Sequence, residues 1–409
     1  MTEETAAPVP TWLKQELFED LLKKLFPKYR SIKSFKAVPG LKPGENYSTI
    51  MLRLYFNVEL EGKFEEISFM LKTPHDFEMY REILKQNNMF AVERDVFLNV
   101  KTELEQMYKD VGLELRFGAS AYEINAPDEY VLLEDLRPAG FQNVDRLEGL
   151  DKSHVLSVLT KLAQWHAASA ARIEFKGAYK QHYFVPTYTD SMRPQIEETA
   201  ETLGKYLLKC LPKYDGYETY TDAVHSLHSK FVDLMYGLNK SDPEDFNALC
   251  HGDLWTNNIL FQYKEGCPEP SETYFVDLQL PRYCSVAFDL IYFLLASTQF
   301  ELKISHFDYF IRNYHDQLKK HLNLLKYPEE KIPTLRSIHK QLLKHGFVVV
   351  LMLCPPVLLD RTDDANLNDF ITESEEGDDL KMQMFSNARY RKHVSAILPW
   401  MLNRGALDY

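Results

Sequence analysis

The order of strand-like and helix-like patterns is the feature that most constrains how this chain can fold. Apolar residues at helical spacing predict an amphipathic helix over residues 11–30. Residues 48–60 and 64–72 then alternate apolar and polar side chains around a glycine turn, which predicts an antiparallel hairpin. A helix over 88–109 and a short apolar strand over 130–134 follow. The first third of the chain is therefore expected to be rich in β-structure.

The rest of the chain has a mainly helical pattern. A long helix with an apolar face is predicted over residues 151–173, and further helices over 192–240. Two short β-like runs, 259–262 and 274–278, surround a turn rich in Gly, Pro and Glu. From about residue 287 onward the pattern is again helical.

This order predicts an α+β fold with two lobes and a cleft between them. We expect a β-rich N-terminal lobe over residues 1–137 and a mainly helical C-terminal lobe over 138–409. A length of 409 residues fits one large bilobal unit. The hydrophobic content of 45% supports a real core and argues against disorder.

The charge and the cysteines exclude several classes of protein. A net charge of −13 makes the chain a poor general binder of nucleic acid or anionic membranes. Five cysteines without a CxxC spacing argue against a disulfide framework or a structural zinc site, so reduced thiols are expected. The longest apolar run, 347–359, is too short to span a bilayer, and no secretory signal is visible. We therefore expect a cytoplasmic protein without nucleic-acid or membrane partners.

The segment HGDLWTNNIL, residues 251–260, carries the strongest chemical signal. Asp253 and Asn258 lie five positions apart, just before an apolar β-like run. Phosphoryl transfer from ATP to a hydroxyl group needs a carboxylate that accepts the hydroxyl proton and oxygen ligands that hold Mg²⁺. An ordinary turn in which both residues satisfy backbone groups is the alternative.

A second carboxylate downstream strengthens this interpretation. Asp277 ends the apolar run 274–278, where it would supply a hard oxygen ligand for Mg²⁺. The alternative is a residue that caps the next turn. Together the two segments predict a phosphotransferase that uses Mg-ATP, with Asp253 as catalytic base and Asn258 and Asp277 as metal ligands. Asp289, at the start of an apolar helix, is expected to brace the catalytic loop.

Four segments resemble the insect ecdysteroid-kinase-like family. They are HGDLWTNNILF, VDLQLPRYCSVAFDLIYFL, GENYSTIMLR and VLLEDLRPAGF. The family is related to choline kinases and aminoglycoside phosphotransferases. The resemblance extends over about residues 40–300 and implies a bilobal protein-kinase-like fold.

The resemblance also implies a nucleotide site in the N-terminal lobe. Gly44, Asn46 and Ser48 would belong to a loop over the ATP phosphates, since a glycine permits close backbone approach and a hydroxyl can donate to phosphate. An ordinary hairpin turn is the alternative for this weak motif.

Further roles in nucleotide binding follow from the same resemblance. Lys72 would contact the α- and β-phosphates, and Glu93 would pair with Lys72 and fix its position. A solvated strand-end lysine and an exposed helical glutamate are the alternatives. Glu134 and Leu136 would present backbone groups to adenine in the connection between the lobes.

Three polar residues are expected to have structural roles. His166, on an apolar helix, is interpreted as a core histidine with satisfied hydrogen bonds rather than a catalytic group. His251 is expected to position the catalytic loop, and Arg282 to brace the loop after Asp277.

The acceptor is expected to be a small hydroxylated molecule. The segment between Asp277 and Asp289 is too short for the activation loop of a protein kinase, which disfavours a protein substrate. The family resemblance implies an ecdysteroid or another steroid-like or foreign alcohol. A cationic acceptor of the choline or aminoglycoside type, or a pseudokinase without turnover, remains as an alternative.

Overall fold

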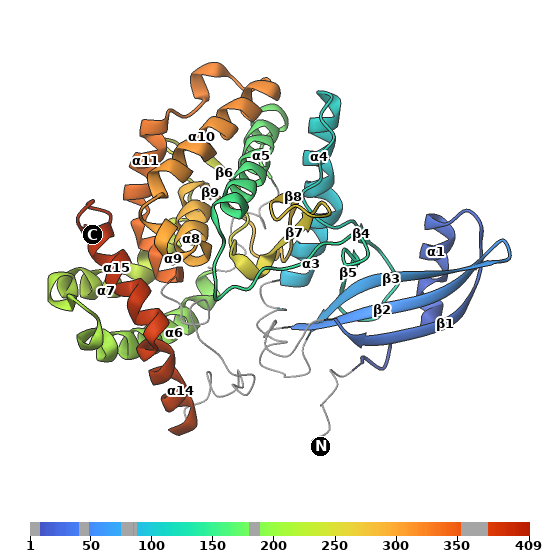
Figure 1. Cartoon of the computed structure of the whole chain (residues 1–409), viewed down its shortest axis with the longest axis horizontal. Coiled ribbons are helices and arrows are strands. Elements are labelled where there is room, and N and C mark those ends of the chain that lie inside the picture. The colour runs from blue at the N-terminus through green and yellow to red at the C-terminus, as the bar shows by residue number, and fades with distance from the viewer. Residues whose placement is uncertain (1–8, 41–48, 75–84, 86–87, 180–188, 353–374) are drawn as a thin grey trace. The chain divides into compact units, whose positions relative to one another are not determined.

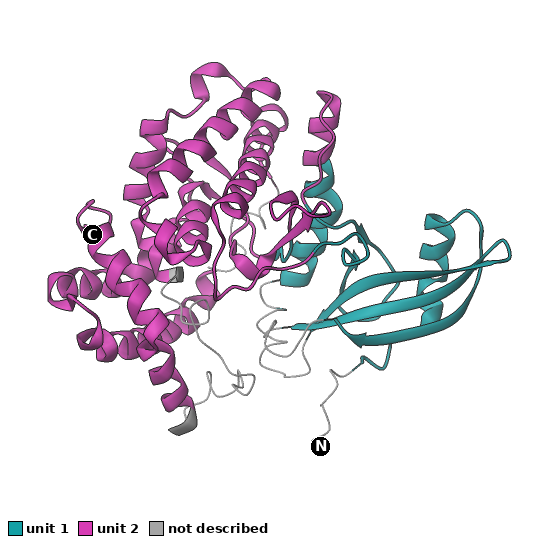
Figure 2. Ribbon diagram, viewed as in Figure 1, with its two compact units in different colours: residues 1–103, 118–141, 276–279 teal, residues 104–117, 142–275, 280–409 magenta. Residues whose placement is uncertain are grey.

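The computed structural model divides the chain into two compact units (Figures 1 and 2). It describes residues 9–40, 49–74, 85, 88–179, 189–352 and 375–409. Unit 1 comprises residues 1–103, 118–141 and 276–279, and unit 2 comprises 104–117, 142–275 and 280–409. The α+β prediction, with a β-rich first part and a mainly helical second part, is confirmed. The division into lobes at residues 137 and 138 stays a prediction.

Unit 1 is built on an antiparallel sheet of five strands in the order β1-β2-β3-β5-β4 (Figure 1). Its strands are β1 (Tyr29–Pro39), β2 (Thr49–Leu60), β3 (Lys63–Pro74), β4 (Ala121–Tyr122) and β5 (Val131–Glu134). The predicted hairpin is confirmed as β2 and β3. Glu61 and Gly62 connect these strands with φ angles of 48° and 84°, a backbone twist that suits a tight hairpin.

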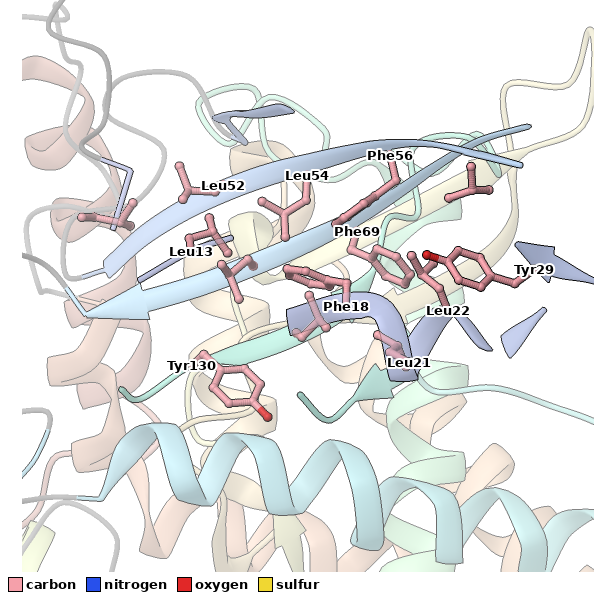
Figure 3. Close-up of a cluster of buried hydrophobic side chains, with 14 residues drawn as sticks. Leu13, Phe18, Leu21, Leu22, Tyr29, Leu52, Leu54, Phe56, Phe69 and Tyr130 are labelled. Carbon is pink, nitrogen blue, oxygen red and sulfur yellow. The ribbon is translucent and has the colours of Figure 1, made fainter. Parts of the chain in front are cut away.

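One face of this sheet forms a hydrophobic core with the N-terminal helices (Figure 3). Alternate residues of β2, among them Leu52, Leu54 and Phe56, are fully or almost fully buried because successive side chains of a strand point to opposite faces. The ring of Phe18, which lies just before α1 (Glu19–Leu25), packs 4.8 Å from the ring of Phe56. The core thus fixes the positions of β2 and β3. Lys72 lies on β3.

The predicted helix over residues 11–30 is too long. Residues Gln15–Phe18 form a 3₁₀ turn and α1 ends at Leu25, whereas β1 already begins at Tyr29. Phe26 has extended backbone angles because Pro27, the next residue, disfavours the helical conformation before it.

The predicted helix over residues 88–109 is confirmed, with an irregularity at its centre. It consists of α3 (Met89–Asp95), a π-helical turn (Val96–Val100) and α4 (Lys101–Asp110). Phe90, Val92 and Glu93 of α3 are buried. A carboxylate on the buried face of a helix needs a partner inside the protein.

Unit 2 is mainly helical. Its longer helices are α5 (Lys152–Lys176), α6 (Arg193–Cys210), α7 (Thr221–Gly237), α8 (Ala287–Ser297), α10 (Phe307–Leu324), α11 (Leu335–Lys344), α14 (Glu375–Ser386) and α15 (Ala388–Leu402). Two short helices are α9 (Phe300–Lys303) and α12 (Val349–Met352). In the described part of the chain, no helix combines the length and the apolar character that crossing a membrane requires.

Two small antiparallel sheets of two strands each lie within unit 2. β6 (Asn247–Cys250) pairs with β9 (Arg282–Ser285), and β7 (Ile259–Tyr263) pairs with β8 (Pro270–Phe275). The run 259–262 is confirmed as strand, whereas the strand predicted over 274–278 ends at Phe275. The four-residue strands β6 and β9 are not predicted by the pattern.

Helix α5 holds β6 in place through two hydrogen bonds to one residue. The indole nitrogen of Trp165 donates to the carbonyl of Leu249, and the amide of Leu249 donates to the hydroxyl of Ser169. All three residues are buried, so these backbone groups of β6 are satisfied by α5 side chains. This anchors the strand that leads directly into the segment 251–258.

A buried ion pair connects β2 to the residue after β5 in unit 1. Arg53 Nε lies 2.9 Å from Asp135 Oδ2, and the two side chains are only 8% and 3% exposed. Asp135 Oδ1 also accepts a hydrogen bond from the amide of Arg137. The pair therefore ties the sheet to the segment that contains Glu134 and Leu136.

Removing one partner of this pair should destabilise the protein. We expect Asp135→Leu to lower the free energy of unfolding by about 3–5 kcal/mol, because the buried guanidinium of Arg53 loses its carboxylate. The double variant Arg53→Met, Asp135→Leu should recover most of this loss. Urea denaturation measures both, with Glu59→Gln, in the exposed pair with Lys33, as the control. An Asp135→Leu midpoint equal to that of Glu59→Gln would contradict the expectation.

Candidate active site

The predicted site residues that the structure describes form two groups, one in each unit. In unit 1, Lys72 on β3 is 4% exposed and Glu93 on α3 is 1% exposed. Lys72 Nζ donates to Glu93 Oε2 at 2.7 Å. The family resemblance implies this pair, and its burial excludes the alternatives of a solvated lysine and an exposed glutamate.

Lys72 contacts two further residues of unit 1, both from the segment 276–279. Its Nζ forms an ion pair with Asp277 Oδ1 and donates to Gln279 Oε1 at 3.2 Å. Gln279 Nε2 in turn donates to Asp277 Oδ2 at 3.3 Å. Asp277 has a φ of 61°, a left-handed conformation that is uncommon outside glycine but favoured by Asp and Asn. This turn directs the carboxylate toward the lysine.

The charges of this cluster are set by competing effects. Burial by itself would lower the pKa of Lys72, but the carboxylates of Asp277 and Glu93 raise it above its ordinary value. Lys72 is therefore a buried cation. Burial raises the pKa of Glu93, and the attraction of Lys72 opposes that rise.

In unit 2, the loop 251–258 follows β6 through a turn that requires glycine. Gly252 has a φ of 84°, and a Cβ atom at this position would lie 1.8 Å from the carbonyl oxygen of Leu280. No other residue fits this space without moving the backbone. His251 is buried, and its Nδ1 accepts from the amide of Asp253 at 3.3 Å, consistent with the predicted positioning role.

Both carboxylate oxygens of Asp253 accept hydrogen bonds within unit 2. Asn258 Nδ2 donates to Asp253 Oδ2 at 3.0 Å and to the Asp253 carbonyl at 2.9 Å. The hydroxyl of Tyr292, on α8, donates to Asp253 Oδ1 at 3.1 Å. The structure thus brings Asp253 and Asn258 together, with the amide oxygen of Asn258 as the atom that could bind a cation.

Asp289, on the first turn of α8, braces the loop as expected. Its Oδ2 accepts from the amide of His251 at 2.7 Å, and its Oδ1 from the amide of Gly252 at 3.1 Å. His166 Nε2 lies 3.2 Å from Oδ2, and His166 Nδ1 lies 2.8 Å from the Tyr314 hydroxyl. Burial alone would raise the pKa of Asp289, but His166 and His251 hold it below its ordinary value. His166 is a core histidine with partners, as predicted.

Among the described residues, one group of three His, Cys or Asp side chains lies close enough together to hold a metal ion, but its surroundings indicate a structural role. The ligand atoms of His166, Cys250 and Asp289 lie within 4.8 Å of one another. However, both oxygens of Asp289 already accept hydrogen bonds. Burial also raises the pKa of the Cys250 thiol well above its ordinary value, so the thiolate that a metal requires is disfavoured.

The remaining predicted residues have simpler surroundings. Glu134 ends β5 and accepts from the amide of Ser120, whereas Leu136 is buried. Arg282 is buried on β9 with its guanidinium 5.5 Å from the ring of Phe288, which fits a bracing role. The predicted phosphate-loop residues Gly44, Asn46 and Ser48 lie outside the described residues. The described cysteines, Cys210, Cys250, Cys267 and Cys284, are free thiols in the structure.

Two residues of these clusters were not predicted from the sequence. Gln279 contacts both Lys72 and Asp277, and its position two residues after Asp277 was the available signal. Tyr292 contacts Asp253 from the middle of an entirely buried helix. Its signal was the spacing of three residues from Asp289, which places both side chains on one face of α8.

Comparison with known proteins identifies the family. The model of the ecdysteroid kinase-like family matches residues 43–327, more than half of the chain. A search of solved structures finds a crystal structure of a choline/ethanolamine kinase family protein from Mesorhizobium loti. That protein is 12% identical, with a TM-score of 0.34, and the alignment covers 94% of this chain and 99% of that chain. The search of curated proteins returned no match.

The family match identifies a kinase-like protein. The matched range includes Lys72, Glu93, Asp253, Asn258 and Asp277. The chain belongs to the ecdysteroid kinase-like family, as the sequence motifs predicted.

Replacing Asp289 should loosen the loop that carries Asp253. In Asp289→Asn, the side-chain NH₂ group would face a backbone amide or His166, so at least one buried donor loses its acceptor. We expect the free energy of unfolding to fall by about 1–3 kcal/mol. Hydrogen exchange of the amides of His251 and Gly252 should become faster, as measured by mass spectrometry. Exchange identical to that of the wild type would contradict this role for Asp289.

Proposed function

We propose that this protein transfers the γ-phosphoryl group of ATP to a hydroxyl group of a small molecule. The proposed acceptor is an ecdysteroid or another steroid-like or foreign alcohol. Membership of the ecdysteroid kinase-like family supports the reaction class. The observation that carries the proposal is the buried cation Lys72, held by Glu93 and Asp277.

A buried lysine between two carboxylates suits a nucleotide site. Taking the charges of Lys72 and Glu93 out of water is costly, and a buried ion pair is often no more stable than apolar residues of similar size. Such a cluster is therefore typical of a functional site, where a fixed cation faces phosphate oxygens. Glu93 fixes the position of the ammonium group, and Asp277, whose side chain is 27% exposed, remains accessible.

The donor chemistry of the two proposed ligands, Asp277 and Asn258, fits magnesium. Mg²⁺ prefers oxygen ligands, and a protein commonly supplies one or two of them while phosphates and water supply the rest. Asp277 would offer a carboxylate oxygen and Asn258 an amide oxygen. When bound, the metal would neutralise charge on the phosphates of ATP. ATP and Mg²⁺ are therefore the proposed co-substrate and cofactor.

Asp253 is the proposed base. The acceptor hydroxyl oxygen would form a bond to the γ-phosphorus as the bond from that phosphorus to the bridging oxygen breaks and ADP leaves. The hydroxyl proton would pass to the Asp253 carboxylate. Asn258 holds Asp253 Oδ2 at 3.0 Å, so the carboxylate is oriented before the acceptor binds.

The activity can be tested without knowledge of the natural acceptor. The purified protein is incubated with Mg-ATP and a panel of steroids, choline and plant alcohols, and mass spectrometry detects a product heavier by one phosphoryl group. Nucleotide binding is measured separately as metal-dependent thermal stabilisation by ATP. Binding without any phosphorylated product or ADP release would favour a pseudokinase and overturn the proposed activity.

Asp253→Asn should fold and bind Mg-ATP but turn over slowly. The amide cannot accept the hydroxyl proton, and general-base catalysis typically contributes about 10²–10⁴-fold to the rate. Steady-state kinetics of ADP release measure kcat. The control is Asp316→Asn, a substitution at a side chain that is 64% exposed. A kcat near the wild-type value would remove Asp253 from this role.

Asp277→Asn should weaken metal-dependent nucleotide binding more than Asn258→Ala does. A carboxylate offers Mg²⁺ a full charge, whereas an amide oxygen offers only a dipole. Asparagine also tolerates the left-handed backbone of Asp277. The substitution therefore removes the charge without adding backbone strain. The measurement is the Mg²⁺ concentration that gives half of the thermal stabilisation by ATP. The same Mg²⁺ requirement in wild type and Asp277→Asn would contradict Asp277 as a ligand.

Hydroxylated steroids should stabilise the protein against heat more than choline does at the same concentration. A bound ligand stabilises the native state by mass action, so the shift in Tm reports relative affinity. An apolar acceptor gains about 25 cal/mol for each Å² of apolar surface that it buries. If choline raises Tm and is phosphorylated while steroids do neither, the acceptor class is wrong but the kinase activity stands.

A further inference from the structure

Two side chains on one face of helix α8 form hydrogen bonds to three consecutive residues of the loop 251–258. Asp289 accepts hydrogen bonds from the amides of His251 and Gly252, and Tyr292 donates to the carboxylate of Asp253. Residues three apart on a helix lie on the same side, so Asp289 and Tyr292 approach the loop together. All eleven residues of α8 are buried, and the helix is therefore a fixed support.

The hydrogen bond from Tyr292 restrains the rotation of the Asp253 carboxylate. Rotation of an Asp carboxylate about its Cβ–Cγ bond is broad and weakly restrained. In this structure Asn258 holds one oxygen and the Tyr292 hydroxyl holds the other, at 3.0 Å and 3.1 Å. Because each oxygen is held by a different side chain, the two hydrogen bonds together set the plane of the carboxylate.

We propose that Tyr292 is a positioning residue that orients the Asp253 carboxylate toward the acceptor hydroxyl. This inference rests on the proposed function of Asp253 as the base. The alternative is that Tyr292 is a core aromatic residue. Only 6% of Tyr292 is exposed, and a buried hydroxyl needs a hydrogen-bond partner whether or not it serves catalysis. The two explanations differ in whether loss of the hydroxyl lowers kcat.

The substitution Tyr292→Phe removes the hydroxyl and keeps the ring. We expect kcat to fall about 10- to 100-fold, since a hydrogen bond to a charged group is lost. The KM for ATP and the thermal stabilisation by Mg-ATP should not change. The matched control is Tyr214→Phe, in which a buried hydroxyl loses its bond to the carbonyl of Phe385, 2.8 Å away. This control should keep the wild-type kcat.

A double-mutant cycle separates positioning from a general structural effect. If Tyr292 acts through Asp253, then adding Tyr292→Phe to Asp253→Asn should change kcat less than about 2-fold, because residues that act as a unit are not additive. Equal losses in the wild-type and Asp253→Asn backgrounds would overturn the proposal. So would a kcat of Tyr292→Phe that matches the Tyr214→Phe control.

Crystal structures provide a readout that does not depend on activity. If the wild type shows no turnover, the proposed function fails, and the orientation of Asp253 still decides the role of Tyr292. We expect the Asp253 carboxylate to rotate in Tyr292→Phe relative to the wild type. An unchanged carboxylate in the variant would overturn the positioning role on its own.

Discussion

The buried charge of Asp289 is the constraint on which the architecture of unit 2 depends. A carboxylate with no exposed surface must be compensated inside the protein. The compensation comes from the amides of His251 and Gly252 and from His166. Because these partners lie on the loop 251–258 and on α5, one carboxylate on α8 holds three segments that are far apart in the sequence in one geometry.

Unit 1 also contains a buried charge that needs compensation, but this charge is positive. Lys72 is a buried cation, and its carboxylate partners come from α3 and from the segment 276–279. That segment reaches the lysine because Asp277 adopts a left-handed backbone, a conformation that usually persists only where the surroundings impose it. The left-handed backbone of Asp277 and the burial of Lys72 therefore depend on each other through their ion pair. The hydrophobic core that packs against β2 and β3 holds the lysine in place.

Sequence reasoning recovered the parts of the structure that have a chemical or periodic signature. The hairpin β2–β3 alternates strongly, and Asp253 and Asn258 have a spacing that phosphoryl transfer explains. Strand β1 was missed because it reads YRSIKSFKAVP, with polar residues on both faces and only partial burial. The strands β6 and β9 have four residues each, which is too short for a period to emerge. Their existence depends on tertiary partners such as Trp165 and Ser169 of α5.

Helix α8 shows why residues that support a candidate site are harder to predict than the residues of its sequence motifs. Its sequence AFDLIYFLLAS is apolar nearly throughout, and this pattern correctly predicts a buried helix. Hydrophobicity says nothing about where a tyrosine hydroxyl finds its partner. The useful signal is the exception to the pattern, since a buried Asp or Tyr must bond to something. Two such exceptions three residues apart predict that a single polar segment crosses that face, and here the segment is the loop that carries Asp253.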